Sequence, residues 1–220
     1  MRFVFPALDA LLIAAGALSQ GTPLTPTSAP DLETLTSQLA LADQQWIPRA
    51  EPLANGGYRY IYKRRAGEPH LKPEQIRALI ANPPNFASER QQIGQLLQVL
   101  HQAGVQVKLT APRKSGAAAE WDPAARTLRI QPSVVGKGSL DFAWVLNHEA
   151  IHVAQSCRNQ GIGSEPRLLG LPTQLPARLS PVLNQPIYRE APERVRQLER
   201  EAYANQERLS LGVQLVRKYC

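Results

Sequence analysis

Apolar residues in the first half of the chain recur with the period of an α-helix. Residues 31–45 are predicted to form a short amphipathic helix whose apolar face is made of leucine: Leu32, Leu35, Leu39 and Leu41. A second helix is expected from Lys72 to about Ala81, where an Asn-Pro-Pro sequence stops it. A third is expected between Ser88, a suitable N-cap, and Gly104, with apolar positions at helical spacing: Ile93, Leu96, Leu97 and Leu100.

The middle of the chain changes to the period of a half-buried strand. Val105, Val107 and Leu109 alternate with polar residues, so a strand is expected there. The segments AAAEW and TLRIQP follow, and residues 122–126 between them complete the signature of a β-hairpin. Further upstream, GGYRYIYKR alternates aromatic and basic residues after a Gly-Gly turn, which predicts an edge strand or one arm of a hairpin.

Two helices are expected in the last third of the chain. Ser139 is a suitable N-cap for a helix that runs to about Cys157, and a last helix begins near Pro192 after a proline-rich loop. The first of these helices is predicted to be buried because it is apolar on several sides: Ala143, Trp144, Val145, Ile151 and Val153. The succession of elements predicts an α+β fold, with a short sheet and its edge hairpin packed on the helix of residues 139–157.

The bulk composition limits the domain count and the class of partner. A chain of 220 residues with 43% apolar residues is sufficient for one globular domain, and two would be cramped. The net charge of +7 raises the question of nucleic acid. However, the basic residues are scattered apart from the short runs 63–65 and 113–114, and no nucleic-acid motif occurs. We therefore expect weak contact with anionic surfaces and no specific nucleic-acid recognition.

The N-terminus has the features of a secretory signal peptide. Residues 1–19 contain one arginine, an apolar run and then small residues, with acceptable cleavage sites at Ala15-Gly16-Ala17 or Ala17-Leu18-Ser19. The apolar run is too short for a comfortable membrane span, and the alternative is an ordinary amphipathic or disordered tail. We expect residues 20–30 to be a flexible leader on an exported protein, periplasmic or extracellular, which would be membrane-tethered if the signal is not cleaved.

The two cysteines, Cys157 and Cys220, lie far apart in the sequence. In an exported protein we expect one disulfide between them, which would tie the C-terminus to the end of the helix of residues 139–157. In a reducing compartment both would be thiols.

The sequence His148-Glu149-x-x-His152 carries the candidate chemistry. Residues i and i+4 of a helix share one face, so both histidines can reach a single Zn²⁺ ion at about 2.0–2.1 Å. Glu149 lies about 100° further round the helix, where it can contact a metal-bound water without binding the metal. This arrangement suits metal-assisted hydrolysis, with Glu149 as the base. The alternative is a pair of histidines that are solvated or satisfied within the core.

A third protein ligand is needed, because an open zinc site takes three and leaves one position for water. The sequence RQLEREAYANQ offers Glu199 and Glu201, which flank the predicted inward face of the last helix on opposite sides, each about 80° away. We favour Glu199, since Ala202 then faces inward, and keep Glu201 as the second choice. His101 and Glu190 are next in line, and His70 is the remaining histidine.

The two motifs together resemble the gluzincins, zinc metallopeptidases in which one helix carries His-Glu-x-x-His and a second helix supplies a glutamate. The resemblance covers about half of the chain and implies a small zincin-like core in residues 105–220, with zinc as cofactor and a C-terminal helix that carries a ligand. It also implies that an edge strand holds an extended peptide or protein substrate beside the cleft. Residues 31–104 match nothing in that family and form an N-terminal helical region of unassigned role. Four residues after the ligand such enzymes often have an aspartate that supports a histidine; here the residue is Tyr203, or Asn205 if Glu201 binds.

Two further side chains near the motifs are candidate hydrogen-bond donors to the oxyanion that develops during hydrolysis. Tyr188 and Tyr203 could donate a hydrogen bond to it, although tyrosines more often pack in cores. Gln155 lies one turn beyond the centre of the motif, where it could be an outer partner of the site or merely polar surface; we favour the surface.

The sequence therefore favours an exported zinc peptidase in which Glu149 activates water against a substrate carbonyl. A catalytically silent envelope protein that binds other molecules on a zincin-like scaffold is the main alternative, and a closed site with a fourth protein ligand would favour it. A basic module that binds anionic polymers through the YKRR sequence is a third.

Overall fold

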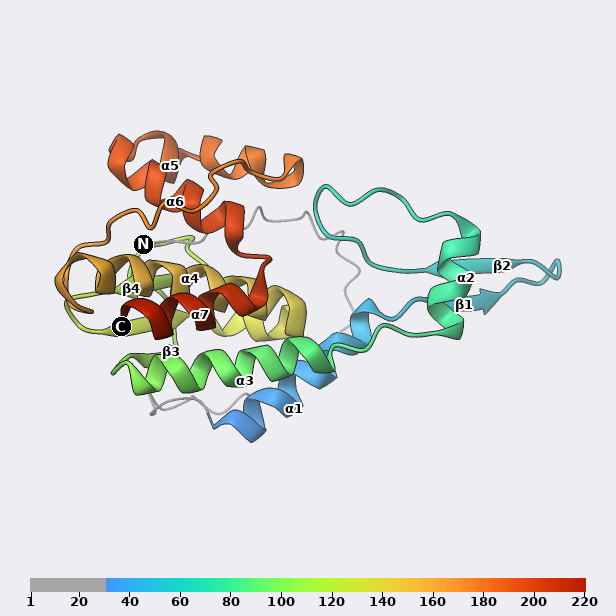
Figure 1. The fold of residues 1–220 in the computed structure, drawn as a ribbon. Coiled ribbons are helices and arrows are strands. Elements are labelled where there is room, and N and C mark those ends of the chain that lie inside the picture. Colours follow the sequence, from blue (N-terminus) through green and yellow to red (C-terminus); the bar gives the residue numbers. More distant parts are fainter. Residues whose placement is uncertain (1–30) are drawn as a thin grey trace.

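The computed structural model describes residues 31–220. The predicted signal peptide and leader therefore lie outside the described residues. Within them the chain combines helices with two small sheets, in agreement with the predicted α+β class (Figure 1). No helix in this part of the chain is both long and apolar enough to cross a membrane.

The longest connections between the elements are residues 62–72, 110–118 and 161–176. The α-helices of residues 31–220 are α1 (Leu32–Asp43), α2 (Pro73–Ala81), α3 (Ala87–Gln102), α4 (Ser139–Gln160), α5 (Pro186–Arg189), α6 (Glu193–Asn205) and α7 (Leu209–Tyr219). The 3-10 helices are η1 (Gln44–Trp46), η2 (Pro132–Lys137) and η3 (Ala177–Asn184). The strands are β1 (Arg49–Pro52), β2 (Tyr58–Ile61), β3 (Gln106–Leu109), β4 (Ala119–Asp122) and β5 (Thr127–Ile130).

Helix α4 is the centre of the fold. The three-stranded sheet has the order β3-β5-β4, with β5 parallel to β3 and antiparallel to β4, so the predicted hairpin is confirmed. The sheet, α3, α6 and α7 all pack against α4 (Figure 1). As a result α4 is buried from Phe142 to Cys157, and even its polar residues are enclosed. The prediction of a buried helix is confirmed.

The N-terminus of α4 is capped by a side chain from far upstream. The predicted N-cap, Ser139, is wrong: the N-cap is Gly138, in the left-handed conformation at φ +94°. The Asp43 carboxylate accepts hydrogen bonds from the Ser139 backbone N–H (2.6 Å) and hydroxyl (2.7 Å), and Arg90 in turn pairs with Asp43. A Cβ on residue 138 would lie 2.8 Å from Asp43 Oδ1, so this close approach requires glycine.

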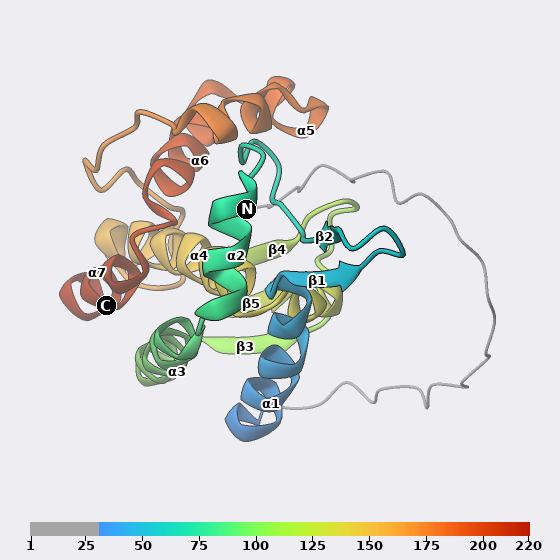
Figure 2. The same ribbon diagram turned by 90° about the vertical axis from the view of Figure 1, so that its right-hand side faces the viewer.

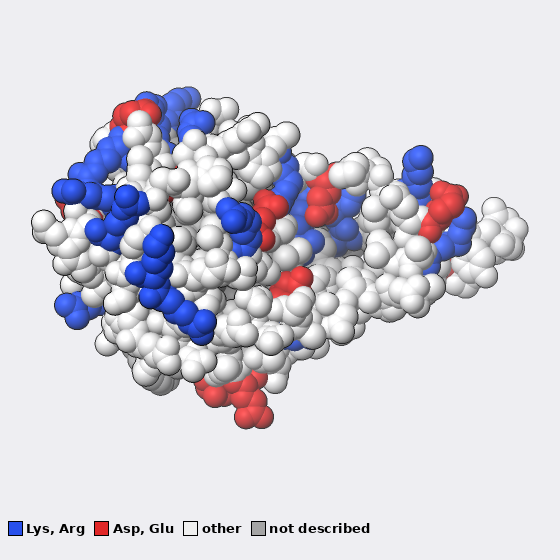
Figure 3. All heavy atoms as spheres, in the orientation of Figure 1, with Lys and Arg blue, Asp and Glu red and all other residues white. Residues whose placement is uncertain are grey.

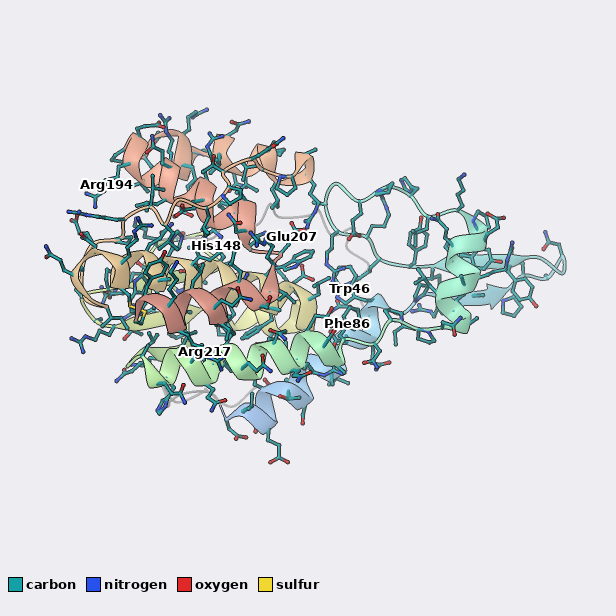
Figure 4. All side chains as sticks on the ribbon, viewed as in Figure 1. Trp46, Phe86, His148, Arg194, Glu207 and Arg217 are labelled. Atoms are coloured by element: carbon teal, nitrogen blue, oxygen red, sulfur yellow. A yellow bond between two sulfur atoms is a disulfide. The ribbon has the colours of Figure 1, made fainter. Side chains whose placement is uncertain are left out.

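Residues 47–86, here called the hairpin lobe, project from the rest of the molecule between α1 and α3 (Figure 1), and in Figure 2 they face the viewer. The predicted strand in GGYRYIYKR is confirmed as β2, which pairs antiparallel with β1. Arg65 returns to the body of the protein, where it forms an ion pair with Asp141 (2.9 Å) and stacks over Trp46 (3.8 Å). Figure 4 shows Trp46 at this junction.

Three local predictions differ from the structure. Leu32 and Leu41 are 45% and 76% exposed, so only half of the leucine face of α1 is buried. Helix α3 begins at Ala87, one residue before Ser88, because Asn85 accepts the Ala87 N–H. The single C-terminal helix is in fact two, α6 and α7, separated at residues 206–208.

A disulfide joins Cys157, near the end of α4, to Cys220, next to the end of α7. The Cα atoms are 5.1 Å apart, and the bond closes a loop with a sequence separation of 63 residues. The cross-link therefore fastens the C-terminal helix to the central one.

Replacing both cysteines with alanine should lower the free energy of unfolding by about 2–4 kcal/mol, because the unfolded chain loses the constraint on this long loop. Denaturant unfolding of the oxidised protein, the reduced protein and the double variant measures the difference. The reduced protein is the matched control for the packing of Cys157, which is buried. Equal stability of all three forms would contradict the prediction.

Candidate metal centre

Three nitrogen and oxygen atoms converge between α4 and α6. His148 and His152 lie one turn apart on α4, and their Nε2 atoms are 3.0 Å apart. Glu199 of α6 places its Oε2 atom 3.2 Å from His148 Nε2 and 3.5 Å from His152 Nε2. All three side chains are buried, and Figure 4 shows His148 in the space between the two helices.

These distances fit a metal ion. Ligands about 2.0–2.1 Å from a tetrahedral ion lie roughly 3.3 Å from one another. The three observed separations, from 3.0 to 3.5 Å, bracket that value. His148, His152 and Glu199 are therefore positioned to hold one metal ion.

Glu201, the second-choice ligand, points to the other side of α6. Its carboxylate accepts hydrogen bonds from the backbone N–H groups of Leu169 (2.8 Å) and Leu171 (2.7 Å) and from Gln155 Nε2 (2.8 Å). Glu199 thus lies beside the histidines, whereas Glu201 holds the segment around residue 170 against α6. Both glutamates are 1% exposed, so burial alone does not separate them.

The charges around the site favour a cation. Burial by itself would raise the pKa of Glu199, but His152 and the hydrogen bonds from both histidines outweigh it and hold the pKa well below its usual range. Burial opposes a charge on His152, yet Glu199 raises the pKa of that imidazole. Burial lowers the pKa of His148 to about 4. An ionised, buried carboxylate beside a neutral imidazole is a favourable environment for a positive ion.

Glu149 is the residue of the motif that does not join the triangle. It is fully buried, and this burial raises its pKa to about 7. Among residues 31–220 neither of its carboxylate oxygens has a hydrogen-bond partner of normal geometry. The Trp121 backbone of β4 opposes this rise, because its interaction with the carboxylate lowers the pKa of Glu149. Burying a carboxylate with so few partners is costly, and its retention calls for a functional reason.

The prediction that Gln155 lies on the surface is wrong. Its side chain is fully buried, because α6 and the segment around residue 170 cover this side of α4. Gln155 Oε1 accepts a hydrogen bond from His152 Nδ1 (2.7 Å), and its amide donates to Glu201. Gln155 thereby directs His152 Nε2 toward the triangle, as outer partners of metal-binding histidines commonly do.

Sequence reasoning missed Asn147, the residue before the motif. Its amide donates to the carbonyls of Gln206 (2.8 Å) and Arg208 (3.2 Å), where α6 ends, and its Oδ1 accepts the N–H of Gly212 in α7. A Cβ on residue 212 would lie 2.4 Å from that oxygen, so glycine is required for the contact. Asn147 therefore positions both C-terminal helices relative to the site. A polar residue inside a predicted buried helix was the available signal.

The two candidate oxyanion donors both lie beside the triangle. The Tyr203 ring packs edge-on against His148, with centroids 4.5 Å apart. Its hydroxyl is 2.9 Å from the hydroxyl of Tyr188. Both side chains are buried, and burial followed by the charge of Glu199 raises the pKa of Tyr188 well above its usual value. The Tyr188 hydroxyl therefore stays protonated and can donate a hydrogen bond.

The remaining candidates stay outside the site. His70 is exposed and hydrogen-bonds with the Tyr62 hydroxyl in the hairpin lobe. His101 is exposed in the last turn of α3, and the Glu190 side chain is 75% exposed.

Comparisons of the chain with protein-family models, curated proteins and solved structures found no match.

Proposed function

We propose that the protein is a zinc-dependent hydrolase of peptide bonds. His148, His152 and Glu199 hold the ion, and Glu149 is the general base. The observation that carries the proposal is the triangle of Nε2 and Oε2 atoms, with the buried Glu149 carboxylate one residue after the first histidine.

The donor set supports zinc. Two imidazoles and one carboxylate are the protein ligands of many catalytic zinc sites, and three ligands leave a tetrahedral position open. When bound, zinc would supply Lewis acidity that polarises a carbonyl and makes water more acidic. Among the described residues, the cluster contains three ligands and no fourth, which favours the hydrolase over the silent alternative.

Glu149 supplies the proton chemistry. As a carboxylate it takes a proton from water as the water oxygen attacks the substrate carbonyl, and it then gives this proton to the departing amine. A pKa of about 7 suits both steps, because the group exchanges a proton readily near neutral pH. Its burial next to β4 excludes bulk water from this exchange.

Tyr188 is the favoured donor to the oxygen that becomes negative in the transition state. Its raised pKa keeps the hydroxyl protonated, and the hydrogen bond with Tyr203 fixes the positions of both rings. The charges of Glu199 and Glu149 both contribute to this rise in the pKa of Tyr188.

Strand β4 is the proposed docking edge for the substrate. Within residues 31–220 it pairs antiparallel with β5, and we propose that an extended peptide adds along its opposite edge. The Trp121 backbone of this strand lies next to Glu149. A peptide paired with β4 would therefore run past the base.

We place the protein in an oxidising compartment outside the cytoplasm. The support is the disulfide between Cys157 and Cys220, together with the signal-like N-terminal sequence. The third alternative, a polymer-binding YKRR sequence, is less favoured because these side chains have internal partners: Lys63 pairs with Gln45, and Arg65 with Asp141. In Figure 3, basic side chains are spread over the face shown, and basic and acidic side chains lie side by side on the hairpin lobe.

The test is hydrolysis of a peptide mixture by the purified protein, before and after chelation, with the metal content measured in parallel. We expect about one zinc per chain, loss of at least 90% of hydrolysis on chelation and recovery on addition of zinc. A zinc-loaded protein that cleaves no peptide in the mixture would overturn the enzymatic proposal and favour the silent alternative.

A further inference from the structure

Gln206 is a buried polar side chain directly after α6. It is the C-cap residue of that helix, and it is 1% exposed. Among residues 31–220 its Oε1 atom has no hydrogen-bond partner of normal geometry. An enclosed amide oxygen costs free energy unless a donor faces it, so the placement of this side chain calls for an explanation.

The position of Gln206 turns it toward His148. Glu199, Tyr203 and Gln206 follow one another at steps of four and three residues, a spacing that puts them on one face of a helix, and Gln206 itself keeps helical dihedral angles. Glu199 Oε2 lies 3.2 Å from His148 Nε2, and the Tyr203 ring packs edge-on against the same imidazole. The face of α6 that carries Gln206 is therefore the face that meets His148.

The main chain of Gln206 is held at the same place. The Asn147 amide donates to the Gln206 carbonyl (2.8 Å), and Asn147 directly precedes His148 on α4. Burial is the main effect on the pKa of His148 and lowers it, and among the groups that raise it is a side-chain hydrogen bond with Gln206, of looser geometry than normal. A partner that raises the pKa of an imidazole favours a proton on the ring, which is the effect of an oxygen acceptor.

Metal binding would leave one ring nitrogen of His148 for such an oxygen. Nε2 faces Glu199 and the position of the ion, so Nδ1 is the nitrogen that carries the ring proton when a metal is bound. An amide oxygen on this N–H fixes the tautomer and the orientation of the ring. Gln155 already acts in this way on His152, whose Nδ1 donates to Gln155 Oε1 at 2.7 Å.

We propose that Gln206 is a positioning residue for metal binding: its amide oxygen accepts the Nδ1–H of His148 and aims Nε2 of that ring at the ion. The resemblance to gluzincins would place such a partner four residues after the ligand, at Tyr203, whereas Gln206 follows Glu199 by seven. Both outer partners, Gln155 and Gln206, are neutral amides, so they orient the imidazoles without adding negative charge beside Glu199. This inference rests on the metal site of the proposed function.

Zinc affinity, measured by competition with a coloured chelator, tests this role. Gln206→Met keeps the length of the side chain without the acceptor and should weaken zinc binding about 10- to 100-fold, the usual cost of losing an outer partner. Gln206→Glu restores an acceptor of the same shape and should return the affinity to near the parental value. Gln197→Met, the same change at an exposed position of α6, is the matched control and should leave the affinity unchanged. Melting temperatures of the metal-free proteins check that each variant is folded.

Proton NMR of the ring N–H groups in the zinc-loaded protein separates positioning from a general effect on the fold. With Nε2 on the metal, each ligand histidine keeps one Nδ1–H, and a hydrogen bond moves its resonance downfield. The His148 resonance should move upfield in Gln206→Met and return downfield in Gln206→Glu. The His152 resonance should stay in place in both variants, because its acceptor is Gln155.

The outcomes distinguish this role from the proposed function. If the parent binds zinc and Gln206→Met binds it as tightly, or leaves the His148 resonance unmoved, the inference is overturned and the metal site stands. If Gln206→Glu binds zinc as weakly as Gln206→Met, the side chain acts by packing alone, and the inference also fails. A parent protein that takes up no zinc would overturn the proposed function and this inference with it.

Discussion

Replacing Glu149 with glutamine should abolish peptide hydrolysis while the metal stays bound. The amide has the shape of the carboxylate but cannot accept a proton from water, and loss of a general base typically costs about 10²–10⁴-fold in rate. The ligands His148, His152 and Glu199 are untouched by the change. The measurements are kcat on a cleaved peptide and zinc content for the parent and the variant.

The thermal stability of the Glu149→Gln variant serves as an internal control for its fold. Glu149 is buried without a hydrogen-bond partner of normal geometry, so removing its charge should not destabilise the fold. The melting temperature should be unchanged or higher. A variant that folds, holds zinc and hydrolyses peptides at the parental rate would show that Glu149 is not the base, or that the activity comes from a contaminant.

Replacing Glu199 with glutamine should weaken zinc binding more than about 100-fold. The reason is that the change removes a ligand and also the negative charge that offsets Zn²⁺, whereas changes to outer partners cost about 10- to 100-fold. Zinc affinity is measured by competition with a coloured chelator. Hydrolysis should fall in parallel, since the ion is lost.

Glu201→Gln is the matched control, because it makes the same substitution two residues away on the same helix. Its carboxylate accepts three hydrogen bonds from Gln155 and the segment around residue 170, and an amide cannot accept all three. We expect a lower melting temperature but retained zinc, with an affinity loss within the range of an outer partner. If Glu201→Gln strips the metal and Glu199→Gln does not, the ligand assignment is reversed.

Local patterns were sufficient to predict the elements that carry the site. Apolar residues on several sides predicted a buried helix around His148 and His152, and two strand-like segments joined by residues 122–126 predicted the β4–β5 hairpin. The position of Ala202 on the inward face of α6 pointed to Glu199, the glutamate that the structure places beside the histidines. These features depend on residues only a few positions apart, so the sequence displays them directly.

Contacts between distant segments could not be predicted in the same way. Asp43 caps α4 from 96 positions upstream, and no local signal marks it as a capping residue for that helix. Gln155 is polar, and only the packing of α6 and the segment around residue 170 onto α4 makes it an internal residue. The break between α6 and α7 depends on Asn147, which binds the carbonyls at the end of α6.

The hydrogen bonds that hold Glu201 in place affect how strongly metal binding and folding are coupled. Backbone N–H groups of Leu169 and Leu171 and the Gln155 amide orient α6 through protein contacts alone. Glu199 is therefore preorganised, and little conformational entropy is lost when an ion arrives. Metal binding and folding are then linked by mass action: zinc at 100 times its Kd would add about 2.7 kcal/mol to the free energy of unfolding. We therefore expect the ion to exchange in and out of a chain that remains folded, unlike the zinc fingers, which unfold without metal.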